Sequence, residues 1–155
     1  LNGHALGGGA ELATAADLRV AGPGADLGFL QAQLNVTTAW GGGIDLLHAV
    51  GPSRALELLA GGRRIGSRQA LELGLVQRVA GDGEGLEAAV HSVITPWLGR
   101  PVQVMRAIKA LLAESRLAAH ERLAAVEERH FAACWVHADH WQAASAALAP
   151  RKPAG

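Results

Sequence analysis

The stretch GHALGGGAEL, residues 3–12, places three consecutive glycines, Gly7 to Gly9, directly before the helix-forming run AEL. Glycine costs a helix about 1 kcal/mol relative to alanine, so three of them at a helix start need a physical reason. Three reasons are open: a phosphate cradle, a tight turn, or bare backbone N–H groups that stabilise a negative oxygen. The dinucleotide fingerprint and the P-loop fit poorly, because Leu12 replaces the last glycine of the first and no Lys follows the glycines as in the second.

Composition limits the function classes. The chain has 155 residues, 50% of them hydrophobic, and a formal net charge of zero. It carries no basic block, so nucleic acid and membrane surfaces are not expected partners. Cys134 is the single cysteine, which fits a reducing compartment, and we expect a cytoplasmic protein without a transmembrane helix. The sequence does not begin with Met, and we expect it to be an N-terminally incomplete piece of a longer protein.

Propensity and turn residues predict an α-rich layout with short strands. Strands are expected at 18–21, 27–30 and 75–79. Helices are expected at 10–16, 44–49, 53–60 and 67–73, followed by an almost wholly helical region from 86 to 148 that is divided by Pro96, Gly99 and Pro101.

Two long segments resemble the crotonase (enoyl-CoA hydratase/isomerase) superfamily: NGHALGGGAELATAADLRVAGPGADLGF at 2–29 and AWGGGIDLLHAVGPSRALELLAGGRRIGSRQALELGLVQRV at 39–79. The resemblance extends to about residue 115. It implies an α/β crotonase-like (ClpP/crotonase) fold, in which residues 1–115 are the C-terminal part of the core domain. Residues 116–155 are then a helical region for packing or oligomerisation. The adenine-binding segment and the other half of the oxyanion hole would lie upstream.

The resemblance also assigns roles to individual residues. The N–H of Gly8 would bind the thioester oxygen of an acyl-CoA, with the helix dipole adding to the donor. Glu11 matches the first of the two acidic residues that family hydratases use, and Gln31 stands where the second acid is expected. The implied catalytic residues are Gly8, Glu11 and Gln31, and the implied substrate-binding residues are Gly7, Gly9, Trp40 and Gly41. The coenzyme A thioester is the substrate, and no separate cofactor or metal is expected.

Gln31 is the informative departure from the family pattern. Hydration needs one group to activate water and another to share a proton, and an amide has no useful pKa for either task. Decarboxylation of a malonyl-type thioester needs fewer proton carriers, because loss of carbon dioxide itself produces the enolate. The segments GGGAELATAADLRV, AWGG with Trp40, and CWVHADHW are similar to those of ethylmalonyl-CoA decarboxylases. Enoyl-CoA hydratase or isomerase activity, another lyase activity, and a non-catalytic acyl-CoA-binding or assembly role remain alternatives.

A second constellation lies near the end of the chain. His130, Cys134 and His137 are spaced to share one helical face, with His140 a turn further, and such a set can in principle hold zinc. The spacing matches no closed structural zinc signature, and Cys and His also fill helix interfaces. Packing is therefore the favoured interpretation.

The resemblance implies that the complete protein is a homotrimer or a dimer of trimers. We expect sedimentation at micromolar concentration to give the mass of such an assembly. A monomer under those conditions would contradict the expectation.

Overall fold

The computed structural model describes residues 1–149 of the chain. Its elements, in chain order, are β1 (His4–Leu6), α1 (Gly8–Thr14), β2 (Val20–Ala21), β3 (Asp26–Gly28), the 3-10 helix η1 (Gln31–Leu34), α2 (Gly42–Val50), α3 (Pro52–Gly61), β4 (Ile65–Gly66), α4 (Ser67–Glu72), β5 (Arg78–Val79), α5 (Leu86–Leu98), α6 (Val102–Trp135) and α7 (Ala138–Leu148).

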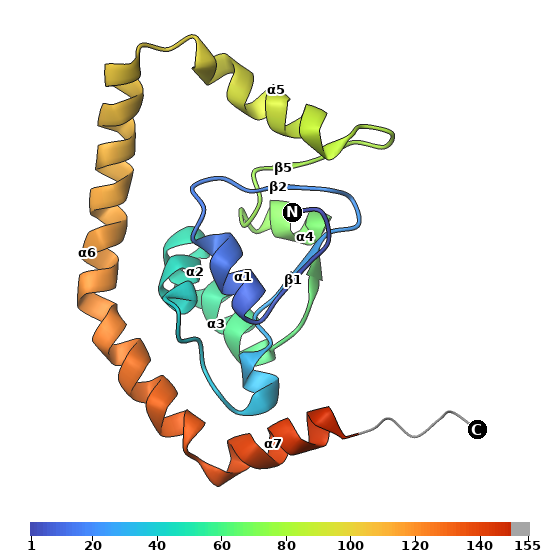
Figure 1. Cartoon of the computed structure of the whole chain (residues 1–155), viewed down its shortest axis with the longest axis vertical. Helices are drawn as coiled ribbons and strands as arrows, with labels where there is room; N and C mark the ends of the chain where they lie inside the picture. Colours follow the sequence, from blue (N-terminus) through green and yellow to red (C-terminus); the bar gives the residue numbers. More distant parts are fainter. Residues whose placement is uncertain (150–155) are drawn as a thin grey trace.

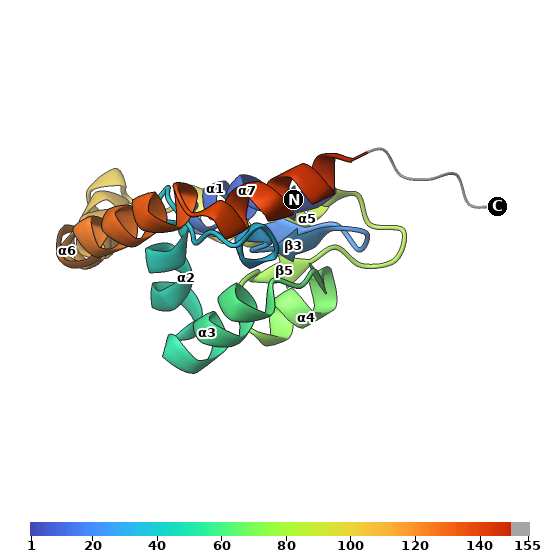
Figure 2. The same ribbon diagram turned by 90° about the horizontal axis from the view of Figure 1, so that it is seen from below.

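Two small sheets and the helices α1 to α4 form the body of the α/β fold (Figures 1 and 2). In the first sheet, β3 lies between β1, which is parallel to it, and β4, which is antiparallel. In the second, β2 and β5 form a parallel pair. The largest fully buried side chains of the core are Leu27, Leu46, Leu75 and Val76. Because β1 and β3 are adjacent and parallel, the turn that follows β1 and the segment that follows β3 leave the sheet at the same edge.

The sequence predicted most of these elements, with different bounds. Helix α1 begins two residues earlier than expected, so Gly8 and Gly9 belong to the helix itself. Strands β1 and β4 were missed, since three and two residues are too few to show the alternating pattern of a half-buried strand. The expected division of the helical region at Pro96 is wrong, because α5 runs through this proline to Leu98. The proline stands so near the helix end that its missing N–H removes one hydrogen bond without stopping the last turn.

A buried arginine ties the end of α1 to the segment before β5. The Arg19 guanidinium donates to the backbone carbonyls of Leu75, Thr14 and Ala16. Burial lowers the pKa of Arg19, and the carboxylates of Asp45 and Asp17 oppose part of that shift. The side chain therefore satisfies carbonyls that the short helix leaves without partners.

Helix α6 passes along one side of the body and is held there by polar side chains (Figure 1). None of its residues is buried. Lys109 pairs with Asp17, and Arg116 donates to both carboxylate oxygens of the buried Asp45 at 2.8 and 2.7 Å. His120 meets the same carboxylate at 2.8 Å. The predicted division between residues 115 and 116 falls inside this continuous helix.

Helix α7 lies below the body in the view of Figure 1 and contacts η1. The buried His140 ring lies 2.7 Å from the carbonyl oxygen of Leu34, and Asn35 donates to the carbonyl of Asp139 at 3.1 Å. Trp135 and Trp141 pack against the His140 ring. Helix α7 thereby fixes the segment that carries Gln31.

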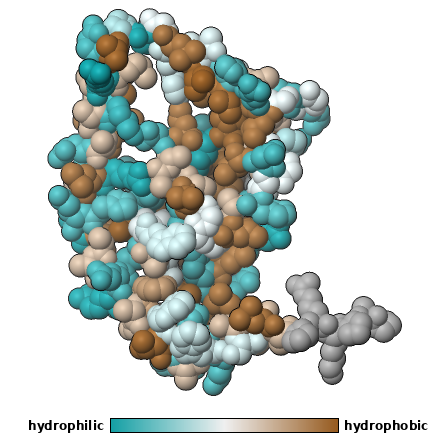
Figure 3. Space-filling model, in the orientation of Figure 1, coloured by the Kyte–Doolittle hydropathy of each residue, from teal (hydrophilic) through white to brown (hydrophobic). Residues whose placement is uncertain are grey.

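Hydrophobic side chains remain open to solvent on α5 and α6, and Figure 3 shows them around α5 and the upper part of α6. Leu98, Val102 and Leu111 are more than half exposed. Large exposed apolar areas mark surfaces that associate with other protein. Across residues 1–149, no helix combines the length and the apolar character needed to cross a membrane.

Candidate active site

The site is built around the start of α1. Gly7 has a φ of +54°, a left-handed value that favours glycine, and its N–H donates to the carbonyl of Gly28 on β3 at 2.8 Å. The carbonyl of Gly7 accepts from Ala10 and Glu11, which closes the first turn. Gly8 is the first helical residue, so its N–H has no acceptor within the helix and lies at the positive end of the helix dipole.

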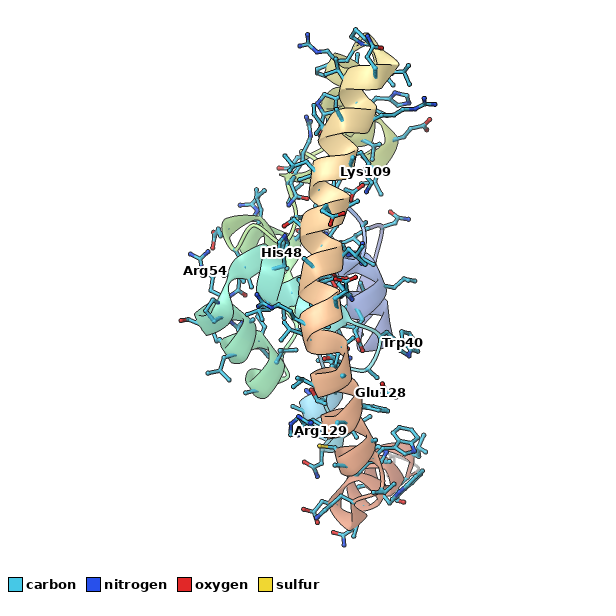
Figure 4. All side chains as sticks on the ribbon, turned by 90° about the vertical axis from the view of Figure 1, so that its left-hand side faces the viewer. Trp40, His48, Arg54, Lys109, Glu128 and Arg129 are labelled. Carbon is cyan, nitrogen blue, oxygen red and sulfur yellow. The ribbon has the colours of Figure 1, made fainter. Side chains whose placement is uncertain are left out.

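The indole of Trp40 covers Gly8. A Cβ atom added to Gly8 would lie 2.5 Å from the indole ring, so only glycine allows this approach. Trp40 itself is 74% exposed, and Figure 4 shows it projecting at the edge of the body beside α1. The aromatic ring therefore forms an open wall next to the Gly8 amide. In contrast, a Cβ on Gly9 would meet nothing within 4 Å, which places Gly9 on the outer side of the helix.

The buried Glu11 carboxylate faces the loop that precedes α2. One oxygen accepts from the Gln31 side-chain amide at 2.7 Å. The other accepts backbone N–H groups from Ala39, Trp40 and Gly42, at 3.2, 2.9 and 3.2 Å. Both oxygens are thus engaged as acceptors, and the carboxylate fixes the loop that carries Trp40.

Gln31 begins η1, and its side chain lies beside Glu11. Its amide nitrogen faces the carboxylate, which assigns the orientation of the side chain because a carboxylate only accepts. The amide oxygen is buried and has no hydrogen-bond partner among residues 1–149. A buried acceptor of this kind can take a hydrogen bond from a bound molecule, but it cannot carry a proton.

The second glycine triplet, Gly41 to Gly43, lets three side chains approach the N-terminus of α2. A Cβ on Gly41 would lie 2.5 Å from the His120 ring, one on Gly42 would strike Glu11, and one on Gly43 would strike Thr38. Gly41 also has a φ of +79°. Its N–H already donates to Glu127 at 2.7 Å, so Gly41 shapes the loop and has no free donor for a substrate.

The predicted residues Gly8, Glu11, Gln31, Trp40 and Gly41 come together, and Gly7 directly precedes Gly8. Gly9 is exposed to solvent. Sequence reasoning missed Thr38 and Glu127, which bond to each other at 2.6 Å and hold the same loop. Glu127 lies on α6, and nothing in the sequence pattern connects the two segments. The glycine run of AWGGG, residues 39–43, did mark Gly42 and Gly43 as unusual positions in the sequence.

The constellation near the end of the chain does not form one helical face, so that expectation is wrong. Helix α6 ends at Trp135, and His137 caps α7 instead, accepting from the Asp139 N–H at 3.2 Å. His140 is used for packing. Within the described residues, no group of three or more His, Cys, Asp or Glu side chains is arranged to hold a metal ion.

Comparison with known proteins identifies the family of the chain. The enoyl-CoA hydratase/isomerase family model matches residues 1–153. The chain is 35% identical over 136 residues to the ethylmalonyl-CoA decarboxylase of Xenopus tropicalis, covering 87% of this chain and 46% of that protein. It is 30% identical over 153 residues to a probable enoyl-CoA hydratase of Bacillus subtilis, covering 99% of this chain and 59% of the relative.

The solved structures show the same fold. The crystal structure of an enoyl-CoA hydratase from Mycobacterium avium superposes with a TM-score of 0.85 at 28% identity, covering 96% of this chain and 57% of that one. The fold is therefore that of the crotonase superfamily. Within it, the chain belongs to the enoyl-CoA hydratase/isomerase family. It spans about half the length of the curated relatives it matches.

The contact between Gly8 and Trp40 gives a direct test of the site geometry. We expect Gly8→Ala to displace the indole, because the new Cβ and the ring cannot occupy the same space. The measurement is the indole N–H resonance of Trp40 in an NMR spectrum, assigned with Trp40→Phe. Gly9→Ala is the matched control: it should leave that resonance in place and raise the free energy of unfolding by about 0.5–1 kcal/mol. Equal shifts in both variants would contradict this geometry.

Proposed function

We propose that the complete protein is an acyl-CoA-processing enzyme that stabilises a thioester enolate, and that its reaction is decarboxylation of a malonyl-type acyl-CoA. The observation that carries the proposal is the pairing of Glu11 with Gln31. Both Glu11 oxygens are occupied by hydrogen-bond donors, and its neighbour is an amide rather than a second acid. The pair is therefore suited to holding η1 and the loop before α2 in place. A reaction that needs no protein side chain as a base fits such a pair best.

Gly8 supplies the electrostatic part of the mechanism. Its N–H lies at the start of α1 without a helical acceptor, next to the exposed Trp40 ring. An enolate places negative charge on the thioester oxygen, and one backbone donor aimed at that oxygen is worth about 3–4 kcal/mol. The substrate would lie between the start of α1 and Trp40, with Gly7 setting the direction of the amide. Among the other predicted substrate-binding residues, Gly41 has its N–H occupied by Glu127, and Gly9 is exposed to solvent.

The reaction itself needs few groups. The bond between the α-carbon and the carboxylate breaks, carbon dioxide leaves, and the electron pair becomes the enolate that Gly8 stabilises. A proton from water then restores the α-carbon. The Trp40 ring can lower the hydration of the substrate carboxylate, which favours its departure. The name of the Xenopus tropicalis relative, ethylmalonyl-CoA decarboxylase, supports the same reaction class.

The second candidate is enoyl-CoA hydratase or isomerase activity. The Bacillus subtilis relative and the presence of Glu11 favour it. A non-catalytic acyl-CoA-binding or assembly role is the third. For all three candidate functions we propose the same location, assembly and ligand. The protein is a cytoplasmic homotrimer or dimer of trimers that binds a coenzyme A thioester and needs no separate cofactor. The exposed hydrophobic side chains on α5 and α6 support the assembly.

The choice of reaction is tested by kcat/KM of the complete protein on ethylmalonyl-CoA, methylmalonyl-CoA and crotonyl-CoA. We expect decarboxylation of at least one malonyl-type thioester and little hydration of crotonyl-CoA. Hydration at ordinary enzyme rates without any decarboxylation would reject decarboxylation and support the second candidate. Binding without turnover of any of the three would support the third.

Variants test the assigned roles. Gly8→Pro removes the N–H at a helix position where proline is tolerated, and we expect kcat to fall by about 10²–10³-fold. Gly8→Ala is the control, since it moves Trp40 but keeps the donor, and its kcat should fall much less. Equal losses in the two Gly8 variants would count against the N–H role.

Gln31→Glu places a carboxylate against Glu11 and the substrate carboxylate, so it should lower decarboxylation, whereas a hydratase site would gain activity on crotonyl-CoA. Glu11→Gln should also slow turnover, because its amide group would face the N–H groups of the loop.

A further inference from the structure

Glu127 of α6 holds the loop that carries Trp40. One carboxylate oxygen accepts from the Thr38 hydroxyl at 2.6 Å and from the Gly43 N–H at 3.2 Å. The other accepts from the Gly41 N–H at 2.7 Å. Helix α2 begins at Gly42 and has no side-chain cap from its own N-terminal residues. Glu127 therefore caps α2 from a distant part of the chain, where a negative charge is favoured by the helix dipole.

Two carboxylates share the loop between them. Glu11 accepts the N–H groups of Ala39, Trp40 and Gly42, and Glu127 accepts those of Gly41 and Gly43. Every amide from residue 39 to residue 43 thus donates to one carboxylate or the other. Glycines adapt to several backbone conformations, so these hydrogen bonds select the one in which the Trp40 ring lies over Gly8.

The helical register of Glu127 is set earlier in α6, by residues that bond to α2. Arg116 and His120 both bond to the buried Asp45, which lies in the first turn of α2. The His120 ring also packs against Gly41. Arg116 and Glu127 are separated by three helical turns, so they face the body from the same side of α6. Figure 4 shows α6 crossing the body from Lys109 to Glu128, the residue next to Glu127.

We propose that Glu127 is a positioning residue that sets the affinity for substrate by holding Trp40 over Gly8. This role rests on the proposed function. The Gly8 amide is fixed separately, by the hydrogen bond of Gly7 to β3, so the oxyanion donor stays in place when the loop moves. Loss of Glu127 removes a wall that contacts the substrate in the ground state and the transition state alike. Such a loss raises KM and leaves kcat nearly unchanged.

The test compares Glu127→Gln with Glu128→Gln in the complete protein. The second variant removes the same charge from the neighbouring exposed residue of α6. We expect Glu127→Gln to raise KM for the malonyl-type thioester about tenfold at nearly constant kcat, because its amide group repels the N–H donors of the loop. We expect Glu128→Gln to resemble the wild type and Glu127→Asp to recover part of the loss. A fall in kcat at constant KM, or equal KM values for the Gln variants, would overturn the proposal.

Hydrogen exchange tests the same role without turnover. The amides of Gly41 and Gly43 should exchange faster in Glu127→Gln than in Glu128→Gln, and the indole resonance of Trp40 should move in the first variant only. Both readouts remain valid in a protein that turns over none of the thioesters, so failure of the proposed function does not hide failure of this inference. If Glu127→Gln does not fold, Thr38→Val removes one partner of Glu127 at nearly constant volume and should shift both readouts in the same direction. Unchanged exchange and an unchanged resonance would overturn the proposal.

Discussion

The buried carboxylate of Glu11 is the interaction on which the arrangement of the site depends. It joins three segments that are distant in sequence: α1, which carries it, η1, which donates through Gln31, and the loop before α2. A buried carboxylate is costly unless donors surround it, so the loop and η1 must adopt positions that supply them. Glycine at 42 is required for the same reason, since a side chain there would strike Glu11.

The helical end of the chain acts on the same segments from outside. Glu127 of α6 completes the hydrogen bonds of the loop, and His140 of α7 holds the carbonyl of Leu34 on η1. Both elements that face Glu11 are therefore supported by residues more than 80 positions later in the chain. The helical region is therefore linked directly to the two segments that surround Glu11 in the candidate site.

The local part of this site could be predicted from the sequence, and the long-range part could not. Glycine spacing and residue type left a negative-oxygen site at the start of α1 as one of three interpretations, and the family resemblance then assigned Gly8, Glu11 and Gln31 to the site. Glu127 has no such signal, because its partners lie 84 to 89 residues away and polar and apolar residues occur all around α6. The same limit explains why β1 and β4 were missed, because their pairing is decided by neighbours in space rather than by their own few residues.

Attachment of α6 by polar side chains makes its helical phase a structural constraint. Arg116 and Glu127 reach the body because the segment between them closes three turns of about 3.6 residues each. One residue added there would rotate Glu127 by about 100° and carry its carboxylate away from the loop. The length of this segment can therefore change only in steps close to whole turns, whereas a helix held by a broad apolar stripe would tolerate a wider range of rotations.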